Sequence, residues 1–459
     1  MDCGISDLVT SPLAQADVDV LVIGSGAGGG VAAMEIARSG RSVIVVEAGR
    51  VGGECHYVAC VPSKALLIAA RDGVSWKEAL HRRDEAADDR NDRAQLREYQ
   101  KAGIAVFRGR ASITGAHEVT VEFEGAHSTL RWGEALVLAP GSEPIVPTIP
   151  GLAEGLAWTS EQALSSYELP SRLLVMGGGA VGCELSQVYT LFGTQVTLVE
   201  RGARLLAAEQ PWIGDMIEKS HVGLGVEVRT GVEAISVEAA DGGSRVNLSD
   251  GSLWMGDRIL FAGGRSARTS GLGVGSLGVA LGDNGEIRVD ARCHVLTDAG
   301  PLPNVFAVGD VTATAPFTHT ANAQARTVAA ELQGRGRDVQ IQASPRVVYT
   351  DPAVWCVGIT EVRAREAGLP VRTATVHLGD IERGALERVE GRFELIADEH
   401  GIVVGAAAVG PGADSWATSA QLAVQQRLTV DVLAETLFAF PTLAEAISLT
   451  ARILANSRA

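Results

Sequence analysis

A glycine-rich turn occurs twice in this 459-residue chain, each time between a short apolar run and a helical pattern. The first copy, GSGAGG, spans residues 24–29, and the second, GGGAVG, spans residues 177–182. In both copies the next apolar run ends in an acid, Glu47 or Glu200, which follows the first glycine by 23 positions. A lone G-x-G-x-x-G turn carries little information, but this matched repeat predicts two βαβ units.

Each unit is suited to binding a dinucleotide. The glycines allow a tight turn and let backbone N–H groups approach a pyrophosphate, which also meets the positive end of the helix. The closing acid accepts hydrogen bonds from a ribose. We therefore expect one dinucleotide at Gly24, Gly26, Gly29 and Glu47, and a second at Gly177, Gly179, Gly182 and Glu200.

Composition excludes several other classes of protein. Hydrophobic residues make up 46% of the chain and charged residues 20%, which predicts a sizeable core. No apolar run reaches the roughly 18 residues of a membrane-spanning helix. The net charge of −16 argues against nucleic acid or an anionic membrane as a partner. Residues 1–17 lack the pattern of a signal peptide, so we expect a cytoplasmic protein.

Local patterns predict the elements between and after the two turns. Residues 75–100 are densely charged with helical spacing, which indicates a solvated helical excursion. Residues 104–138 alternate as antiparallel strands do, and the proline-rich residues 140–151 indicate a linker. We expect a helix over residues 321–332, and mixed strands followed by helices from Ser344 onward.

The chain has six cysteines, of which only two are close together. Cys55 and Cys60 form this pair, and the other four are scattered at Cys3, Cys183, Cys293 and Cys356. In a reducing compartment a close pair is more often catalytic or metal-binding than structural. The alternative interpretation is two buried cysteines without chemistry.

The spacing of the pair suits a dithiol that receives electrons. Even at i,i+4 on an ideal helix the Cβ atoms lie about 5–6 Å apart, whereas a disulfide needs about 3.8 Å. We therefore expect a distorted turn, and Pro62, two residues after Cys60, is consistent with one. A strained pair at a helix terminus is easier to reduce and has a lowered thiolate pKa.

Taken together, these features resemble the class I pyridine nucleotide–disulfide oxidoreductases, which include dihydrolipoyl dehydrogenase, glutathione reductase and mercuric reductase. The resemblance covers nearly the whole chain. Besides the two glycine turns it includes Cys-x4-Cys-x-Pro-Ser-Lys ending at Lys64, Gly-Ser-x-Pro at residues 141–144, Gly309-Asp310, and Pro441-Thr442-x-x-Glu445.

The resemblance implies an α/β fold with two Rossmann-like domains, which bind FAD and NAD(P), and a C-terminal α+β dimerisation domain. We expect a homodimer with these boundaries: residues 1–150 as the first part of the FAD domain, 151–268 as the NAD(P) domain, 269–342 as the second part of the FAD domain, and 343–459 as the dimerisation domain.

The resemblance also implies roles for single residues. Cys60 is expected to face the flavin as charge-transfer donor, and Cys55 to be the interchange thiol that meets the substrate. Lys64 is expected near the flavin N5, paired with Glu184. The implied cofactor-binding residues are Gly24, Gly26, Gly29, Glu47, Gly53, Lys64, Gly141, Gly309, Asp310 and His319 for FAD, and Gly177, Gly179, Gly182, Glu200 and Gly264 for NAD; no metal site is expected.

His319, at the helix start that would face the flavin, is expected to contribute its backbone and not acid–base chemistry. Glu200 suits the 2′-hydroxyl of NAD and repels the 2′-phosphate of NADP, so we favour NADH, although Arg201 and Arg204 lie close by.

The chain departs from the family pattern at its C-terminal motif. Phe440 stands where disulfide reductases carry a histidine that reaches across the dimer as the acid–base for thiol exchange. Phenylalanine cannot shuttle a proton, and such catalysis is worth about 10²- to 10⁴-fold. Glu445 is retained, either as a catalytic residue or as an orphaned ion-pair or helix-cap residue. Two changes in the redox loop are Tyr57 for the usual asparagine and Ala59 for the usual glycine.

The sequence therefore predicts an oxidoreductase that passes electrons from NAD(P)H through FAD to Cys55 and Cys60, and on to a disulfide, a quinone or a metal ion. Mercury is disfavoured because residues 454–459 lack the cysteine pair of mercuric reductase. Two alternatives stay open. One is a flavin diaphorase that reduces quinones with vestigial cysteines, and the other is a slow flavoprotein redox sensor.

Overall fold

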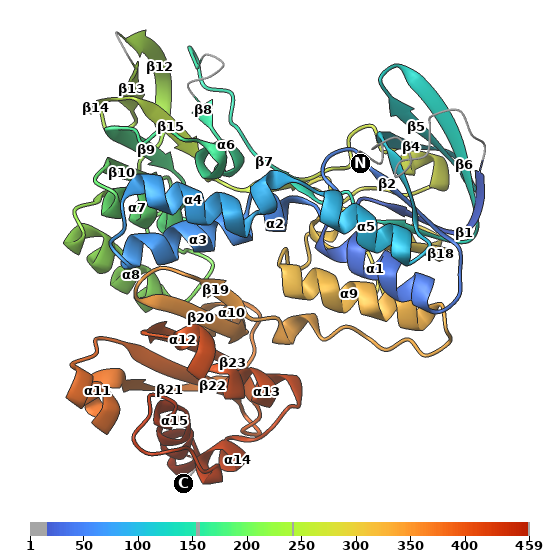
Figure 1. Ribbon diagram of the computed structural model, residues 1–459. Coiled ribbons are helices and arrows are strands. Elements are labelled where there is room, and N and C mark those ends of the chain that lie inside the picture. The colour runs from blue at the N-terminus through green and yellow to red at the C-terminus, as the bar shows by residue number, and fades with distance from the viewer. Residues whose placement is uncertain (1–15, 153–156, 241–242, 458–459) are drawn as a thin grey trace. The chain divides into compact units, whose positions relative to one another are not determined.

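The structure is a computed structural model that describes residues 16–152, 157–240 and 243–457. The opening segment, with Cys3, lies outside the described residues. The chain divides into two compact units, each assembled from three separate stretches (Figure 1). The first unit comprises the described parts of Met1–Pro62, Arg83–Pro144 and Arg265–Ile341; the second comprises those of Ser63–Arg82, Ile145–Gly264 and Gln342–Ala459.

An eight-stranded sheet forms the centre of the first unit, with the path β17-β18-β6-β1-β2-β3 and the β4–β5 hairpin joined to β6. The strands are β1 (Ala16–Ile23), β2 (Val43–Glu47), β3 (Ala105–Arg108), β4 (Arg110–Gly115), β5 (Glu118–Phe123), β6 (Ala126–Leu138), β17 (His294–Thr297) and β18 (Gly300–Ala307). Helices α1 (Ala27–Arg38) and α9 (Thr318–Glu331) pack together and contribute to the core on one face of this sheet.

Side chains of β1 alternate between two buried clusters. Val20 and Val22 pack with Ile36 of α1, while Leu21 and Ile23 pack with the β5 side of the sheet. Because successive residues of a strand point to opposite faces, both faces of β1 are buried, as its near-continuous apolar sequence predicts.

The expected antiparallel strands after residue 104 are confirmed for β4, β5 and β6, but β3 differs. It pairs in parallel with β2 over Ile44–Glu47. The physical reason is the helical crossover between β2 and β3, since a chain that leaves one end of a sheet and returns through helices re-enters in parallel.

The charged segment after residue 75 is helical, as predicted, but it is neither continuous nor wholly solvated. It forms α4 (Trp76–Ala86), a 3₁₀ turn at Asp88–Arg90 and α5 (Arg93–Lys101). Leu96 and Tyr99 of α5 are buried. Because the segment is densely charged, the sequence did not reveal the apolar side of α5. This side contributes to the core of the first unit.

A five-stranded parallel sheet, β11-β10-β9-β15-β8, carries the second glycine turn in the second unit. Its strands are β8 (Ala157–Trp158), β9 (Arg172–Met176), β10 (Gln195–Glu200), β11 (Glu227–Thr230) and β15 (Arg258–Phe261), with helices α7 (Ala180–Leu191) and α8 (Pro211–Gly223). An antiparallel sheet of β12 (Ala234–Ala240), β13 (Gly243–Leu248) and β14 (Leu253–Gly256) accompanies it.

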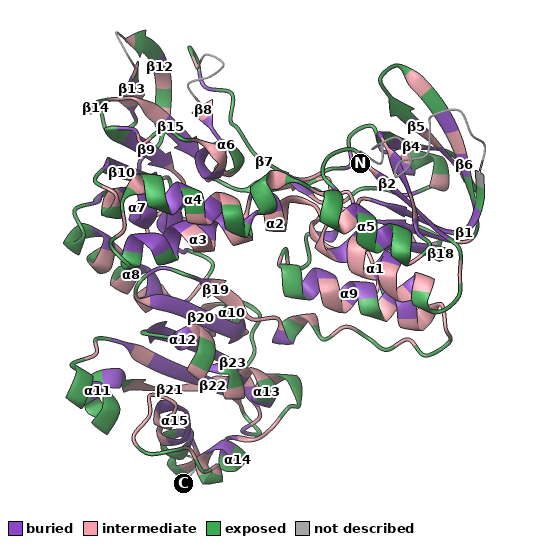
Figure 2. Ribbon diagram, viewed as in Figure 1, coloured by how far each residue is buried: buried purple, intermediate pink, exposed green. Residues whose placement is uncertain are grey.

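The last part of the second unit is an antiparallel sheet with the order β19-β20-β23-β22-β21. Its strands are β19 (Arg346–Val348), β20 (Ala353–Gly358), β21 (Val371–His377), β22 (Arg392–Asp398) and β23 (Val403–Gly410), followed by α13 (Thr418–Gln425), α14 (Val430–Glu435) and α15 (Glu445–Asn456). This order of strands and then helices was predicted, and the sheet's inner strands β20 and β23 are largely buried (Figure 2). The four-part domain division stays a prediction.

Candidate functional site

The first glycine turn is a closely packed cradle at the end of β1. Gly24 has φ +92°, and a Cβ there would lie 2.1 Å from the Ala139 carbonyl oxygen. A Cβ at Gly29 would lie 1.9 Å from the oxygen of Gly24 itself. Any side chain at these two positions would disrupt the turn, so the glycines are required by the geometry. Gly26 caps α1, whose N-terminus therefore opens at the turn.

Glu47 lies against this turn. Its carboxylate accepts hydrogen bonds from the Ser25 amide (2.8 Å) and hydroxyl (2.6 Å), and from the Gly49 amide (2.7 Å). The acid expected to meet a ribose is thus held in place at the end of β2 beside the glycine turn. A carboxylate held here, beside a turn that leaves no room for side chains, fits the dinucleotide that the sequence predicts at this turn.

The redox loop packs against the same turn through Gly53. This residue has φ +74°, and a Cβ on it would come within 2.4 Å of the Gly26 Cα. Contact this close is possible only between two glycines. It brings the short helix α2 (Glu54–Tyr57) and its Cys55 next to the expected dinucleotide site.

The turn between the two cysteines is distorted, as the spacing predicted. Helix α2 ends at Tyr57, Val58 has φ −139°, and α3 (Cys60–Arg71) begins at the second cysteine. The hydroxyl of Thr318, the first residue of α9, donates to the Cys55 Sγ at 3.1 Å and lies 3.9 Å from the Cys60 Sγ. Two sulfurs therefore meet at one hydroxyl at a helix N-terminus.

The other described cysteines are in different surroundings. Cys183, Cys293 and Cys356 are buried, and burial raises the pKa of all three thiols, for Cys293 to about 12. A buried thiol of this kind is a poor nucleophile at neutral pH. Among the described cysteines, Cys55 and Cys60 therefore stay the predicted reactive pair.

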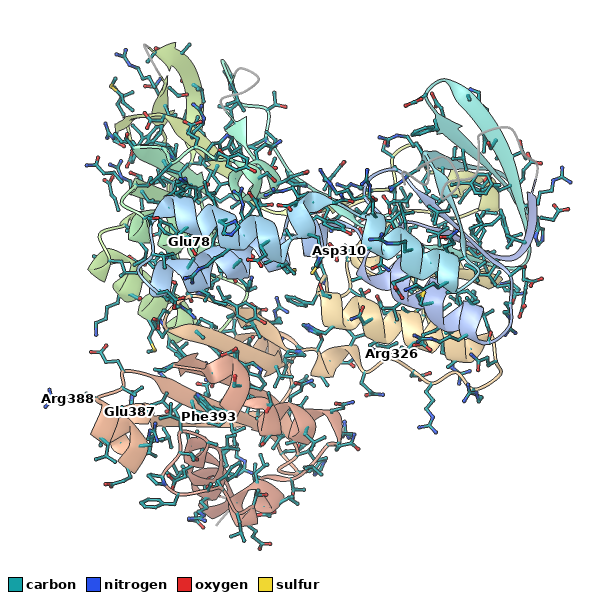
Figure 3. All side chains as sticks on the ribbon, viewed as in Figure 1. Glu78, Asp310, Arg326, Glu387, Arg388 and Phe393 are labelled. Carbon is teal, nitrogen blue, oxygen red and sulfur yellow. The ribbon has the colours of Figure 1, made fainter. Side chains whose placement is uncertain are left out.

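Asp310, labelled in Figure 3, follows Gly309 (φ +80°) at the end of β18. Its carboxylate accepts a hydrogen bond from the Ser142 hydroxyl at 2.6 Å, and that hydroxyl accepts one from the Arg265 Nε at 2.7 Å. Arg265 also donates to Glu54 at 2.6 Å. A chain of hydrogen bonds thus joins the expected FAD ribityl-binding residue to the residue before Cys55.

This network contains residues that sequence reasoning did not single out: Glu54, Ser142, Arg265 and Arg268, the last of which also pairs with Glu54. The sequence offers only a weak indication that these residues belong to the site. Arg265 follows Gly264 directly and Ser142 follows Gly141, both motif glycines. Nothing local connects them to Glu54, which lies 211 positions from Arg265 and 88 from Ser142. Thr318 was missed for the same reason, although its neighbour His319 was considered. The His319 ring stacks on Phe317, with centroids 5.3 Å apart.

The second glycine turn, at the end of β9, repeats the construction of the first. Gly177 has φ +116°, and the Ala262 backbone leaves no room for a Cβ at this position. A Cβ at Gly182 would lie 1.8 Å from the Gly177 oxygen. Gly179 caps α7. Glu200 accepts from the amides of Gly178 and Gly202, both at 2.6 Å. Gly264, the last residue of the Ile145–Gly264 stretch, has φ +138°.

Lys64 and Glu184 are brought together in the second unit, as predicted from the resemblance. The Nζ–Oε2 distance is 2.7 Å, and the Glu184 side chain is only 8% exposed. The second Glu184 oxygen accepts from the Tyr349 amide at 2.9 Å, and the ammonium lies 4.5 Å from the centroid of the Tyr349 ring. Every polar atom of the carboxylate is thus paired, as a buried ion requires.

Glu445 stands at the first turn of α15, where its carboxylate accepts from the Thr442 amide at 3.1 Å. This contact gives Glu445 a local structural role, but Glu445 is not the helix cap: the N-cap residue of α15 is Ala444, which has no side-chain cap hydrogen bond. Phe440, in the position of the family histidine, has a side chain that is 72% exposed in the described chain. A catalytic role for Glu445 stays a prediction.

Comparison with known proteins gives two family matches. Residues 18–325 match the pyridine nucleotide-disulphide oxidoreductase domain, and residues 344–451 match the dimerisation domain of the same proteins. The chain belongs to the pyridine nucleotide–disulphide oxidoreductase family. Its cofactors are FAD and NAD, in agreement with the two glycine cradles, and it is an oxidoreductase.

Individual relatives cover nearly the whole chain. A mercuric reductase of Streptomyces lividans is 35% identical, with 95% of each chain covered, and a dihydrolipoyl dehydrogenase of Bacillus subtilis is 30% identical, with 94% of each covered. Among solved structures, a Cu(II) complex of the HOCl-induced flavoprotein disulfide reductase RclA of Escherichia coli has a TM-score of 0.85 at 25% identity, over 96% of this chain and all of that one. LpdA of Mycobacterium tuberculosis gives the same TM-score and identity, over 95% of this chain and all of that one.

No helix among the described residues is both long enough and apolar enough to cross a membrane.

Proposed function

We propose that this oxidoreductase uses NADH to reduce a disulfide acceptor through the Cys55–Cys60 pair. One observation carries the proposal: the two sulfurs meet at the Thr318 hydroxyl, on a loop that Gly53 holds against the first dinucleotide cradle. A vestigial cysteine pair would not need this arrangement. A diaphorase would pass electrons directly from its flavin to the acceptor and would not use the pair.

The chain's own residues have these roles in the proposal. The Gly24 turn, Glu47 and Asp310 would hold FAD, which would supply a two-electron carrier between the nicotinamide and the cysteine pair. Thr318 donates a hydrogen bond to sulfur, which favours the thiolate over the thiol. The N-terminus of α9 adds its positive dipole end near the same sulfurs. Cys55, which is half-buried, is the thiol assigned to attack the acceptor.

A panel of acceptors tests the proposal. Steady-state NADH oxidation is measured with disulfides, quinones and thiol-reactive metal ions, in the wild-type protein and in Cys55→Ala. We expect disulfide reduction in the wild type and its loss in Cys55→Ala. Quinone reduction that persists undiminished in the variant, with no disulfide activity in the wild type, would establish the diaphorase instead. Turnover below about 0.1 s⁻¹ with every acceptor, against an enzyme median near 10 s⁻¹, would point to a redox sensor.

A thiol-reactive metal ion is the second candidate acceptor. Its support comes from the similar mercuric reductase and from the Cu(II) complex of RclA, because thiolates are soft ligands that suit such ions. Within the described part of the chain there is no group of three or more His, Cys, Asp and Glu residues arranged to hold a metal. The two sulfurs would therefore have to bind such an ion without a third protein ligand from that part.

We also propose that the chain is a homodimer, on the basis of the matched dimerisation domain at residues 344–451. Light scattering coupled to size-exclusion chromatography tests this directly. A mass near twice the 47.8 kDa of the chain is expected, and a monomer at micromolar concentration would refute it.

A further inference from the structure

The redox loop contains a histidine–carboxylate pair immediately after Cys55. His56 lies on α2, and its Nε2 is 2.8 Å from the Asp88 Oδ2. The His56 side chain is 40% exposed and that of Asp88 56%, so water and an incoming acceptor can reach the pair. A histidine with one nitrogen on a carboxylate keeps its second nitrogen available for proton transfer.

Asp88 is held in place by an unusual backbone. Asp88, Asp89 and Arg90 are three consecutive non-glycine residues with φ between +50° and +57°. The run is fixed at both ends, by hydrogen bonds from the Arg90 amide to the Ala87 oxygen (2.8 Å) and from the Asn91 amide to the Asp88 oxygen (2.8 Å), and Arg50 donates to the Arg90 carbonyl at 3.0 Å.

Energetics argue against a purely structural role for the pair. Left-handed backbone costs roughly 1–2 kcal/mol per residue for L-amino acids, somewhat less for Asp. An exposed ion pair returns only about 0–1 kcal/mol. The ion pair therefore contributes less to the stability of the fold than the left-handed backbone of residues 88–90 costs. Strain that is retained in this way beside a reactive group is typical of functional sites.

The other groups around the ring cannot replace it as a proton donor. The His56 ring meets the Tyr57 ring edge-on, with centroids 4.8 Å apart, but Tyr57 is buried and burial raises its pKa to about 12. The charged groups nearest to Tyr57 are Asp88, Asp92, Arg50 and Arg108. Asp92 is paired with Arg108, and Glu54, on the other side of Cys55, is paired with Arg265 and Arg268.

We propose that His56 is the acid–base residue of disulfide reduction in this protein, with Asp88 as its positioning residue. The pair takes the place of the cross-dimer histidine that Phe440 replaces, and it lies within the same chain as the thiol it serves. The inference rests on the proposed function, because it assumes that Cys55 exchanges with a disulfide.

The reduced pair holds two electrons as two thiolates, and His56 carries one proton as the imidazolium. The Cys55 thiolate attacks one sulfur of the acceptor, and the acceptor S–S bond breaks. The leaving thiolate receives the proton from the His56 imidazolium. The Cys60 thiolate then attacks Cys55 Sγ, which forms the Cys55–Cys60 disulfide and releases the second thiolate, and solvent protonates it.

Two disulfides that differ in their leaving group test the role of His56. Dihydroxyethyl disulfide releases a basic alkyl thiolate, which needs a proton, whereas dithiobis(nitrobenzoate) releases an acidic aromatic thiolate, which does not. The NADH-reduced holoenzyme is mixed with each acceptor in a stopped-flow instrument. The variants are His56→Asn, Asp88→Asn and, as a matched control, His127→Asn, an exposed histidine on β6.

In His56→Asn we expect the rate with the alkyl disulfide to fall by about 10²- to 10⁴-fold, while the aromatic disulfide reacts nearly as in the wild type. Asp88→Asn is expected to show the same contrast between the two disulfides with a smaller loss, because the imidazole stays on the loop but loses the carboxylate that orients it. His127→Asn is expected to match the wild type with both acceptors.

Three results would overturn the inference in distinguishable ways. Equal losses with both disulfides in His56→Asn would show that His56 shapes the loop and does not transfer a proton. Unchanged rates with both would show that it has no role. A wild-type protein that reduces neither disulfide would refute the proposed function itself, and this inference with it.

Discussion

At the scale of single residues, the Thr318 hydroxyl distinguishes the redox pair from the other described cysteines. It donates to the Cys55 sulfur at 3.1 Å, whereas Cys183, Cys293 and Cys356 are buried, and burial raises the pKa of their thiols. A hydrogen bond to a charged group is worth about 1.5–3 kcal/mol, and about 1.4 kcal/mol corresponds to a factor of ten. Thr318→Val should therefore slow the alkylation of Cys55 by iodoacetamide at neutral pH by about tenfold or more. The rate is measured on the reduced protein; Thr318→Ser is the matched control, and an equal rate in Thr318→Val would contradict the assignment.

A second prediction at this scale separates the roles of the two thiols. If Cys60 faces the flavin, the two-electron-reduced protein shows a long-wavelength charge-transfer absorption band. Cys60→Ser should abolish the band and leave FAD bound, whereas Cys55→Ser should keep it. Absorption spectra during NADH titration provide the measurement. A band that survives in Cys60→Ser but disappears in Cys55→Ser would reverse the assignment.

At the scale of elements, each βαβ unit holds its closing acid against its own glycine turn. Glu200 accepts from the Gly178 and Gly202 amides, which fixes a carboxylate at the end of β10. A fixed negative charge there disfavours a 2′-phosphate. The ratio of kcat/KM for NADH to that for NADPH should exceed one, and Glu200→Gln should lower it by about tenfold, which corresponds to 1.4 kcal/mol. A wild-type ratio below one would mean that Arg201 or Arg204 outweighs the carboxylate.

The Lys64–Glu184 pair links α3 with α7 and makes a prediction about stability. Removing one member of a buried pair leaves the other charge uncompensated and costs about 3–5 kcal/mol when both are fully buried. Lys64 is 32% exposed, so we expect a smaller loss, about 2 kcal/mol, in Glu184→Ala. Urea unfolding of the two single variants and of Lys64→Met/Glu184→Ala measures the coupling. Strictly additive losses would show that the ion pair does not contribute.

At the scale of the whole molecule, the chain carries a dimerisation domain whose C-terminal motif has lost its histidine. If His56 has taken over proton transfer, restoring the motif should matter only where His56 is missing. Phe440→His should change the alkyl disulfide rate little in the wild-type background. In the His56→Asn background it should recover part of the loss, which is limited to about 10²- to 10⁴-fold. Stopped-flow rates and the oligomeric mass are measured together, because the recovery requires an intact dimer. A large gain in the wild-type background would show that proton transfer was never replaced.

The sequence by itself determined the features that depend on local backbone chemistry. Gly24 and Gly177 occupy positive-φ turns that leave no room for a Cβ, and the apolar runs around them have the lengths of buried strands. Such constraints act within a few residues, so they can be recognised without a structure. The distorted turn between Cys55 and Cys60 was predictable for the same reason, since it follows from the spacing alone.

The tertiary structure decided which distant residues meet. Thr318 lies 263 positions from Cys55, Arg265 lies 211 from Glu54, and Asp88 meets His56 from a left-handed run of backbone after α4. The parallel pairing of β3 likewise depends on the crossover that precedes it. Contacts of this kind arise when separate elements pack on one core, and no local pattern specifies them. The sequence therefore identified the cofactors and predicted the reactive sulfurs, and the fold supplied the hydroxyl, the arginines and the histidine–aspartate pair around them.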